Sequence, residues 1–332
     1  MARLQKSELL ARAEEAIRSS RLNVLYLNPG RHPALYRVYD GRRSFLVQVY
    51  IWNITHGGRN RSVDEYRIQA TGVLQFNSKP NARNLVLGWW DDVGVFAGWD
   101  IRQHRGPLGT SPSLQISETA LRKAVLGGFA PYVKDNNETA IAFKPEFIGT
   151  YIRFLQALHD SGSVPAEAAI LKRLSESPDR INERNIDEEV AEERKRALVS
   201  TWRAIRAIDF RERVLTAYSC RCAMCGIQLR LVDGAHILPV SEPTSSDRTA
   251  NGIALCALHH RAYDCGLVTF DSTLKIHVND LTIRMLRADD EVAGLKEFRK
   301  ALRPIICAPQ DKRDRPAVRF VKKANALRGW KL

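Results

Sequence analysis

The sequence lacks any run of about 18 apolar residues, the length that a membrane-spanning helix needs. Its opening stretch, MARLQKSELLARAEEAI, carries acidic residues and no apolar core, so it is not expected to be a secretory signal. We also find no internal repeat and no low-complexity tract. These absences predict a cytoplasmic protein without a membrane partner, and 332 residues allow two domains, each with its own core.

Cysteine is scarce, and five of the six cysteines lie within residues 220–265. In a chain without a secretory signal, such clustering favours metal ligands over disulfides. A CxxC pair followed about thirty residues later by a CxxH pair suits a tetrahedral structural Zn²⁺. Unmetallated core cysteines are the alternative. The predicted ligands are Cys222, Cys225, Cys256 and His259, with Cys220 as a less usual substitute for Cys222 and Cys265 left over.

Negative charge is in deficit, since the formal net charge is +14 and the isoelectric point is near 9.7. Such an excess favours a polyanionic partner, most often nucleic acid, although a soluble protein can simply be basic. Residues 299–332 hold eleven Lys and Arg against two Asp. They are expected to be either an arm that binds the DNA backbone or a disordered basic tail.

The first part of the chain is rich in aromatic and β-branched residues with the period of strands from 24 to about 105. Hairpin turns are expected at Asp40-Gly41 and near Asp91-Asp92. Helix signals follow at 118–128 and 146–159, with a strand at Thr139–Phe143 between them. We therefore predict a mostly antiparallel, β-rich recognition domain at 1–160.

Two stretches of this domain are candidate DNA contacts, because basic, polar and aromatic side chains suit phosphates and base edges. A solvated loop is the alternative for the first stretch, and core tryptophans are the alternative for the second, where Trp89, Trp90 and Trp99 could line a pocket for a base. The candidates are His56, Arg59, Asn60, Arg61, Tyr66 and Arg67 in the first stretch, and Trp99, Arg102, His104 and Arg105 in the second.

Residues 161–200 are charged and free of aromatic residues, which predicts a helical or partly mobile linker. Helical spacing resumes at 201–218, and alternation at 267–278 predicts a hairpin. The third segment, 201–332, is predicted to be a catalytic domain with a basic tail.

Four polar residues in this domain are not needed for the zinc: His236, Asn251, His260 and Asp264. With them, the motifs AHI (235–237), NG (251–252) and LCALHHRAYD (255–264), framed by CAMC (222–225), resemble the HNH or ββα-metal endonucleases. The resemblance covers about residues 200–285 and is nearest to the subgroup found in bacterial restriction enzymes.

The resemblance implies a role for each residue. His236 would be the general base, since an imidazole that is neutral near pH 7 can take a proton from water. Asn251 would orient His236 or stabilise the finger loop. His260 and Asp264 would hold one divalent ion, Mg²⁺ or Mn²⁺ with Ni²⁺ as a further option. Ala235 stands where many relatives have a metal ligand, and Asp233 is a substitute candidate.

Together these features predict an α+β protein: a β-rich recognition domain, a helical linker and a ββα-metal finger with structural zinc. The expected function is metal-dependent cleavage of double-stranded DNA in restriction or defence, with dependence on DNA modification as a variant. A single such site cuts one strand, so a homodimer is expected, at least on DNA. The alternatives are a catalytically inactive zinc-finger DNA-binding regulator and an RNA-directed HNH nuclease.

Overall fold

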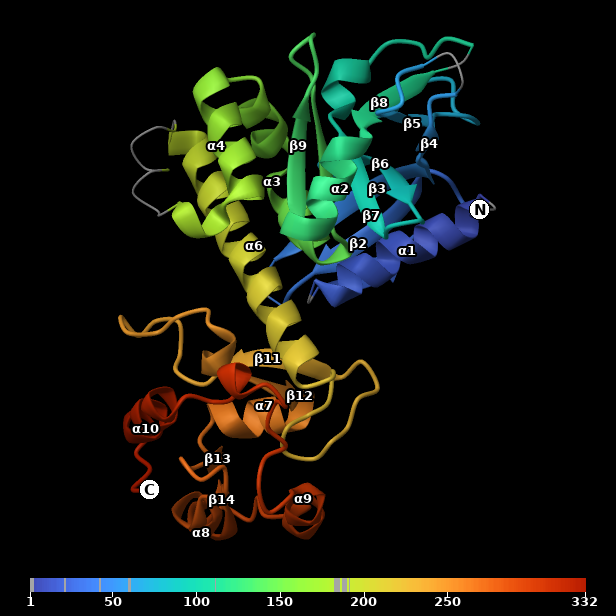
Figure 1. Ribbon diagram of the computed structural model, residues 1–332. Helices are drawn as coiled ribbons and strands as arrows, with labels where there is room; N and C mark the ends of the chain where they lie inside the picture. The colour runs from blue at the N-terminus through green and yellow to red at the C-terminus, as the bar shows by residue number, and fades with distance from the viewer. Residues whose placement is uncertain are drawn as a thin grey trace. The chain divides into compact units, whose positions relative to one another are not determined.

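The computed structural model in Figure 1 describes residues 3–20, 22–41, 43–58, 61–110, 112–181, 186, 190 and 192–332. The chain divides into two compact units, Met1–Ile208 and Asp209–Leu332. Arg59 and Asn60, two of the candidate DNA contacts, lie outside the described residues. Within the described part of the chain, no helix is both long and apolar enough to cross a membrane.

A seven-stranded sheet forms the centre of the first unit, in the order β1-β2-β3-β6-β7-β10-β9. Neighbouring strands are antiparallel except β3 and β6, which are parallel. The mostly antiparallel, β-rich prediction is thereby confirmed. The strands are β1 (Asn23–Tyr26), β2 (Ala34–Tyr39), β3 (Ser44–Asn53), β6 (Ala82–Trp90), β7 (Val95–Trp99), β9 (Phe129–Val133) and β10 (Thr139–Phe143).

This sheet is buried on both faces, which explains its continuous apolar strands. In β3, Val49 and Ile51 point into one core, and Tyr50 and Trp52 point into the other. Because successive side chains of a strand point to opposite faces, the same alternation runs through β6. The aromatic residues of these strands are therefore core residues.

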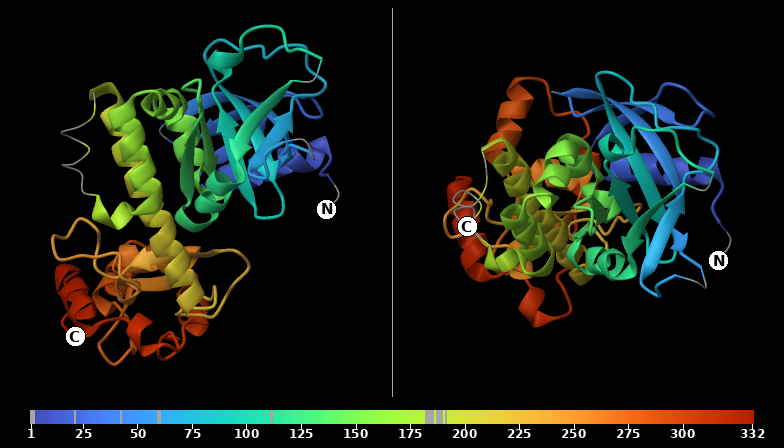
Figure 2. Two further views of the ribbon diagram at one scale, coloured as in Figure 1. Left: turned by 45° about the horizontal axis from the view of Figure 1, so that its top comes forward. Right: turned by 90° about the horizontal axis from the view of Figure 1, so that it is seen from above.

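The first face is covered by α1 (Lys6–Ser19) and α3 (Ile148–Gly162), which follows the short 3-10 helix η2 (Pro145–Phe147). The second face is covered by α2 (Glu118–Gly127) and by a small sheet in the order β4-β5-β8. Figure 2 shows α1, in dark blue, against the sheet. The bounds of the small sheet and its neighbouring 3-10 helix are β4 (Thr55–His56), β5 (Glu65–Gln69), β8 (Ser113–Ser117) and η1 (Ile101–His104).

The segment expected to be a linker contributes to the first core. It contains α4 (Pro165–Glu176), η3 (Pro178–Arg180) and the beginning of α6 (Glu192–Ala217). Leu171, Leu174 and Leu198 are fully buried in the core that lies under α1. Helices α4 and α6 thus pack their apolar faces on the first unit, and the described part of this segment belongs to that unit.

The second unit begins within α6 and is built around a strand–strand–helix motif (Figure 1). The predicted hairpin at 267–278 is present as β13 and β14. The basic tail is folded rather than disordered, because Phe320, Val321 and Ala324 of α10 are buried in the core of this unit. The remaining elements are η4 (Thr249–Asn251), β13 (Val268–Phe270), β14 (Ile276–Val278), α8 (Asp280–Ala288), α9 (Leu295–Ala301), η5 (Lys312–Asp314) and α10 (Val318–Leu327).

Candidate active site

The motif consists of β11 (Val232–His236), β12 (Gly252–Cys256) and α7 (Ala257–Asp264). The two strands are antiparallel, with His236 opposite Gly252. The last turns of α6 cross this pair so closely that a Cβ at Gly252 would overlap the side chain of Val214. Glycine at 252 is therefore required by packing, and it allows the end of β11 to lie beneath the helix.

The fold of this unit brings the four predicted zinc ligands together. The ligand atoms of Cys222, Cys225, Cys256 and His259 all lie within 4.8 Å of one another, a group called here the Cys3His cluster. The Nδ1 atom of His259 lies 3.5 Å from Sγ of Cys222 and 3.3 Å from Sγ of Cys256. Sγ of Cys225 lies 3.9 Å from Sγ of Cys256.

These distances fit a tetrahedral ion, because Zn–S bonds of about 2.3 Å place two sulfurs about 3.8 Å apart. Burial, and then the neighbouring thiols, raise the pKa of the Cys225 thiol to about 12. Three thiolates this close repel one another, and a Zn²⁺ ion would offset that repulsion. The Cys3His cluster is therefore suited to zinc, which would join the loop at 222–225 to the start of α7.

His236 stands at the end of β11 with its ring held on two sides. Its Nε2 atom lies 3.0 Å from Oδ1 of Asp247. The ring of Phe210 stacks on the imidazole with centroids 3.7 Å apart and an angle of 9° between the planes. Local sequence patterns predicted neither partner. Asp247 had a weak signal, as an acidic residue four positions before Asn251.

Asn251 is fully buried and binds the loop that follows β11. Its Oδ1 accepts a hydrogen bond from the backbone N–H of Leu238 at 2.9 Å. Its Nδ2 donates to the backbone oxygens of Leu238 and Ser246 and to Oγ of Ser245. The amide thus ties together both ends of the loop that carries Asp247.

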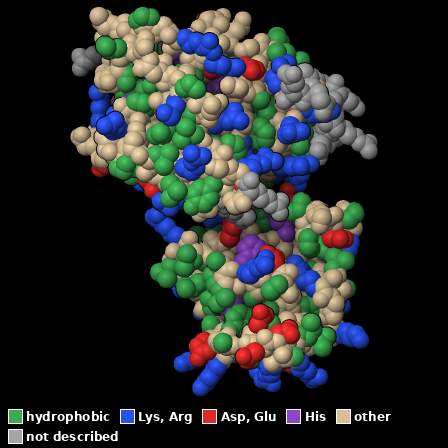
Figure 3. Space-filling view, turned by 180° about the vertical axis from the view of Figure 1, so that it is seen from behind, with side chains coloured by type: hydrophobic (Ala, Val, Ile, Leu, Met, Phe, Trp, Pro, Cys, Tyr) green, Lys and Arg blue, Asp and Glu red, His purple; other side chains and the backbone are tan. Residues whose placement is uncertain are grey.

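His260 and Asp264 lie on one face of α7, as their spacing predicts, and His260 Nε2 is 3.6 Å from Asp264 Oδ2. Their side chains are 26% and 54% exposed, so a ligand can reach both. On the second unit, Figure 3 shows histidine side chains at the surface with acidic and basic side chains around them. Ala235 is buried, and Asp233 accepts a hydrogen bond from Nε of Arg211 at 2.7 Å.

In the first unit, part of the first stretch of candidate DNA contacts lies on the small sheet. His56 on β4 pairs with Tyr66 on β5, and their rings meet edge to face with centroids 5.5 Å apart. Arg67 lies opposite Thr55 in the same pair of strands. Arg61 lies 3.7 Å from the carboxylate of Glu65 and is half-exposed.

The second candidate stretch points largely into the unit. Trp99 is fully buried, and its Nε1 donates to the backbone oxygen of Gln115, so its ring offers no free face to a base. Trp89 and Trp90 are buried as well. Arg105 is exposed.

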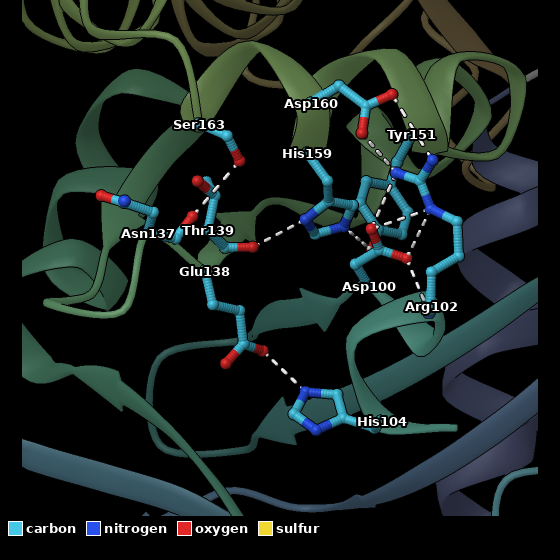
Figure 4. A network of polar contacts seen from close by, with 10 residues as sticks. All are labelled: Asp100, Arg102, His104, Asn137, Glu138, Thr139, Tyr151, His159, Asp160 and Ser163. Carbon is cyan, nitrogen blue, oxygen red and sulfur yellow. Dashed lines mark hydrogen bonds and ion pairs between the residues drawn. The ribbon is translucent and has the colours of Figure 1, made fainter. Parts of the chain in front are cut away.

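Figure 4 shows that Arg102 and His104 belong to a network of polar contacts inside the unit. Arg102 pairs with Asp100 at 2.7 Å and with Asp160 of α3 at 2.5 Å. His104 Nε2 lies 2.7 Å from Glu138. Burial alone would raise the pKa of Glu138, but hydrogen bonds from His104 and Lys134 outweigh it and lower the pKa to about 2. The network fastens η1 to α3 and to the turn before β10.

Two known families match parts of the chain, one in each unit. Residues 222–271 match the family described as HNH endonuclease, and residues 46–152 match the family described as Methylase-associated X1. The second unit therefore carries an HNH endonuclease domain, and the protein is a nuclease. Among curated proteins, none matches this chain.

One solved structure, described as a modification-dependent TagI restriction endonuclease, aligns with 85% of this chain and 81% of its own. The identity is 10% and the TM-score is 0.28. A TM-score this low does not establish a common fold.

Proposed function

We propose that this protein is a metal-dependent endonuclease of the restriction type that hydrolyses phosphodiester bonds of double-stranded DNA in the cytoplasm. The main support for this proposal is that the imidazole of His236, at the end of β11, is held in one orientation. Asp247 and Phe210 fix its ring, as catalysis of proton transfer requires of a general base.

In this mechanism His236 takes a proton from the water that attacks the scissile phosphorus. The carboxylate of Asp247 accepts a hydrogen bond, so Nε2 of His236 carries the ring proton and Nδ1 keeps a free lone pair. Nδ1 has no hydrogen-bond partner among the described residues. Asp247 is thus a positioning residue that sets the tautomer and the aim of the base.

His260 and Asp264 would hold the catalytic divalent ion. Their donor atoms are 3.6 Å apart and accessible, which leaves the other coordination positions to water and substrate oxygens, as Mg²⁺ prefers. Mn²⁺ or Ni²⁺ also suits a site that includes an imidazole. The bound ion would neutralise charge on the phosphate and on the departing 3′-oxygen. Asp233 is left out of this site because Arg211 already binds its carboxylate.

The Cys3His cluster would hold a structural Zn²⁺, and Asn251 would hold the finger loop. Its hydrogen bonds reach Leu238, Ser245 and Ser246 but not His236, so loop stabilisation is the role that the geometry supports. We assign no proton transfer to Asn251.

The first unit would select the DNA. Its matched family is described as associated with methylases, which supports a restriction role and makes dependence on DNA modification a natural variant. The contacts we propose are His56, Arg61, Tyr66 and Arg67 on and beside the small sheet, together with the exposed Arg105. Because one HNH site cuts one strand, we also propose that two copies act together on DNA.

The test is cleavage of plasmid DNA in four forms: unmodified, methylated, hydroxymethylated and phosphorothioated. Wild type should cut at least one form with Mg²⁺ or Mn²⁺, and His236→Ala should bind the same DNA without cutting it. An intact plasmid in every form would leave the inactive DNA-binding regulator as the better proposal. Preferential cleavage of RNA at matched salt would favour the RNA-directed nuclease.

The role of Asp247 has its own test. Asp247→Asn should lower kcat roughly 100-fold with little change in KM, because the base is misdirected while substrate contacts remain. Asp271→Asn is the matched control, since Asp271 pairs with His277 at 2.7 Å in the same unit. Equal losses in the two variants, or recovery of full activity by Asp247→Asn at high pH alone, would contradict a positioning role.

A further inference from the structure

A basic groove of about 380 Å³ lies between the loop after β11 and helix α10. The loop contributes Ser246 and Arg248, and the helix contributes Arg319 and Lys323. No acidic residue is among the described residues that line it. We call this feature the basic groove.

The charges in the basic groove are only partly neutralised. Lys323 pairs with Glu242 at 3.4 Å and donates to Oγ1 of Thr244 at 2.7 Å. Arg248 and Arg319 form no ion pair with any residue that the structure describes. The guanidinium of Arg319 rests over the ring of Phe320, 4.7 Å from its centroid, which limits its motion.

A hydroxyl in the basic groove also lacks a partner. Oγ of Ser246 is buried and forms no hydrogen bond with the described residues. A phosphate oxygen would accept from either guanidinium, since arginine presents several N–H donors in one plane, and from this hydroxyl once its side chain turns toward the groove. The chemistry of the lining thus points to a phosphate group.

The basic groove adjoins the proposed base through consecutive residues. Ser246 and Arg248 line the groove, and Asp247 between them binds His236 at 3.0 Å. The start of α10 is tied to the same region, because the N–H of Ala317 donates to the backbone oxygen of Ala250 at 2.9 Å. An anion in the groove would therefore bind the same loop that holds the proposed base.

We propose that the basic groove binds a backbone phosphate of the DNA strand next to the phosphate that is cut. This inference rests on the proposed function. The contact would hold the strand while His236 acts, and it would carry no sequence preference, because phosphate contacts position a duplex without reading bases. The same contact would give α10, which belongs to the folded basic tail, a role in substrate binding.

The experiment measures binding and cleavage of a DNA duplex by the full-length protein with Arg248→Gln or Arg319→Gln. Arg287→Gln on α8 is the matched control, since Arg287 is exposed and outside the groove. Each groove variant should weaken binding roughly 10-fold and lower the slope of log K against log salt by about 1. KM should rise and kcat should stay close to wild type.

Three outcomes would overturn the inference while leaving the nuclease proposal intact. One is a groove variant that behaves like Arg287→Gln while wild type still cuts DNA. Another is a loss of kcat with an unchanged salt slope, which would mean that the variants act through Asp247. A third is displacement of the duplex by inorganic phosphate at an ionic strength far below that at which chloride displaces it. That result would indicate a site for free phosphate.

A wild-type protein that neither binds nor cuts DNA would instead refute the proposed function. Arg319→Lys provides a folding control, because it retains the charge and should retain most of the salt slope. Zinc content and melting temperature equal to wild type would exclude misfolding of the glutamine variants.

Discussion

Asn251→Ala should open the loop that carries the partner of the proposed base. The substitution removes the only described acceptor of the Leu238 N–H and the donor to the backbone oxygen of Ser246. The backbone oxygen of Leu238 keeps a donor, because Oγ of Ser245 also donates to it. Two backbone groups, the buried N–H of Leu238 and the partly buried oxygen of Ser246, are thus left without their Asn251 partner.

An unsatisfied buried polar group costs about 1–3 kcal/mol, and partial access of water lowers that figure. We expect a total of about 3 kcal/mol, which corresponds to roughly 100-fold in an opening equilibrium. Amide hydrogen exchange at single-residue resolution measures this directly. Protection of the Leu238 amide should fall by about that factor in the full-length protein.

The adjacent amide provides an internal reference. The N–H of Ile237 donates to the backbone oxygen of Asn251, a bond that alanine retains, so its protection should change much less. Asn279→Ala is the external control, because Asn279 caps α8 in the same unit and does not contact the loop. Equal losses at Ile237 and Leu238, or an unchanged Leu238, would refute this account of Asn251.

Three further predictions concern the metal, the pH and the packing. Cys256→Ala should abolish zinc binding, measured by native mass spectrometry, and unfold the second unit; unchanged metal content would contradict the Cys3His assignment. Burial lowers the pKa of His32 to about 4, and its Nε2 accepts the N–H of Ile51, so the neutral ring is needed. In the unfolded chain the ring has a pKa near 6.5, so the first unit should lose stability as pH falls from 6.5 to 4. The loss should be about 2 kcal/mol once solvent screening of the half-buried ring is included. In urea titrations, His32→Gln should make the stability of the first unit less dependent on pH over this range. Gly252→Ala should destabilise the second unit by about 1–3 kcal/mol because the new Cβ overlaps Val214, whereas Gly266→Ala meets no neighbouring atom and tests only its positive φ.

Local sequence patterns were sufficient for much of this protein. The alternation of apolar residues and the Asp-Gly turn predicted the β2–β3 hairpin, and strand β10 has the predicted bounds, Thr139–Phe143. The CxxC and CxxH spacings predicted the Cys3His cluster because each pair is set by a short stretch of backbone. The HNH motif likewise depends on neighbours within one strand–strand–helix unit.

Contacts between distant segments could not be derived in this way. Arg102 looked available for DNA, yet it pairs with Asp160, which is 58 residues away. The charged segment at 161–200 looked like a linker, yet Leu171 and Leu198 are buried in the first core. A charged side chain has the same local sequence signal whether its partner is DNA, water or a carboxylate across the fold.

The sequence by itself determined where the possible metal ligands and the motif that resembles HNH nucleases lie, at residues 222–264, since both depend on residue types at short spacings. Only the tertiary structure decided how the base is held. Asp247 reaches His236 because Asn251 closes the loop between them, and Phe210 reaches the ring because α6 crosses the strands at Gly252. These contacts depend on backbone closure and packing, which residue spacing does not encode.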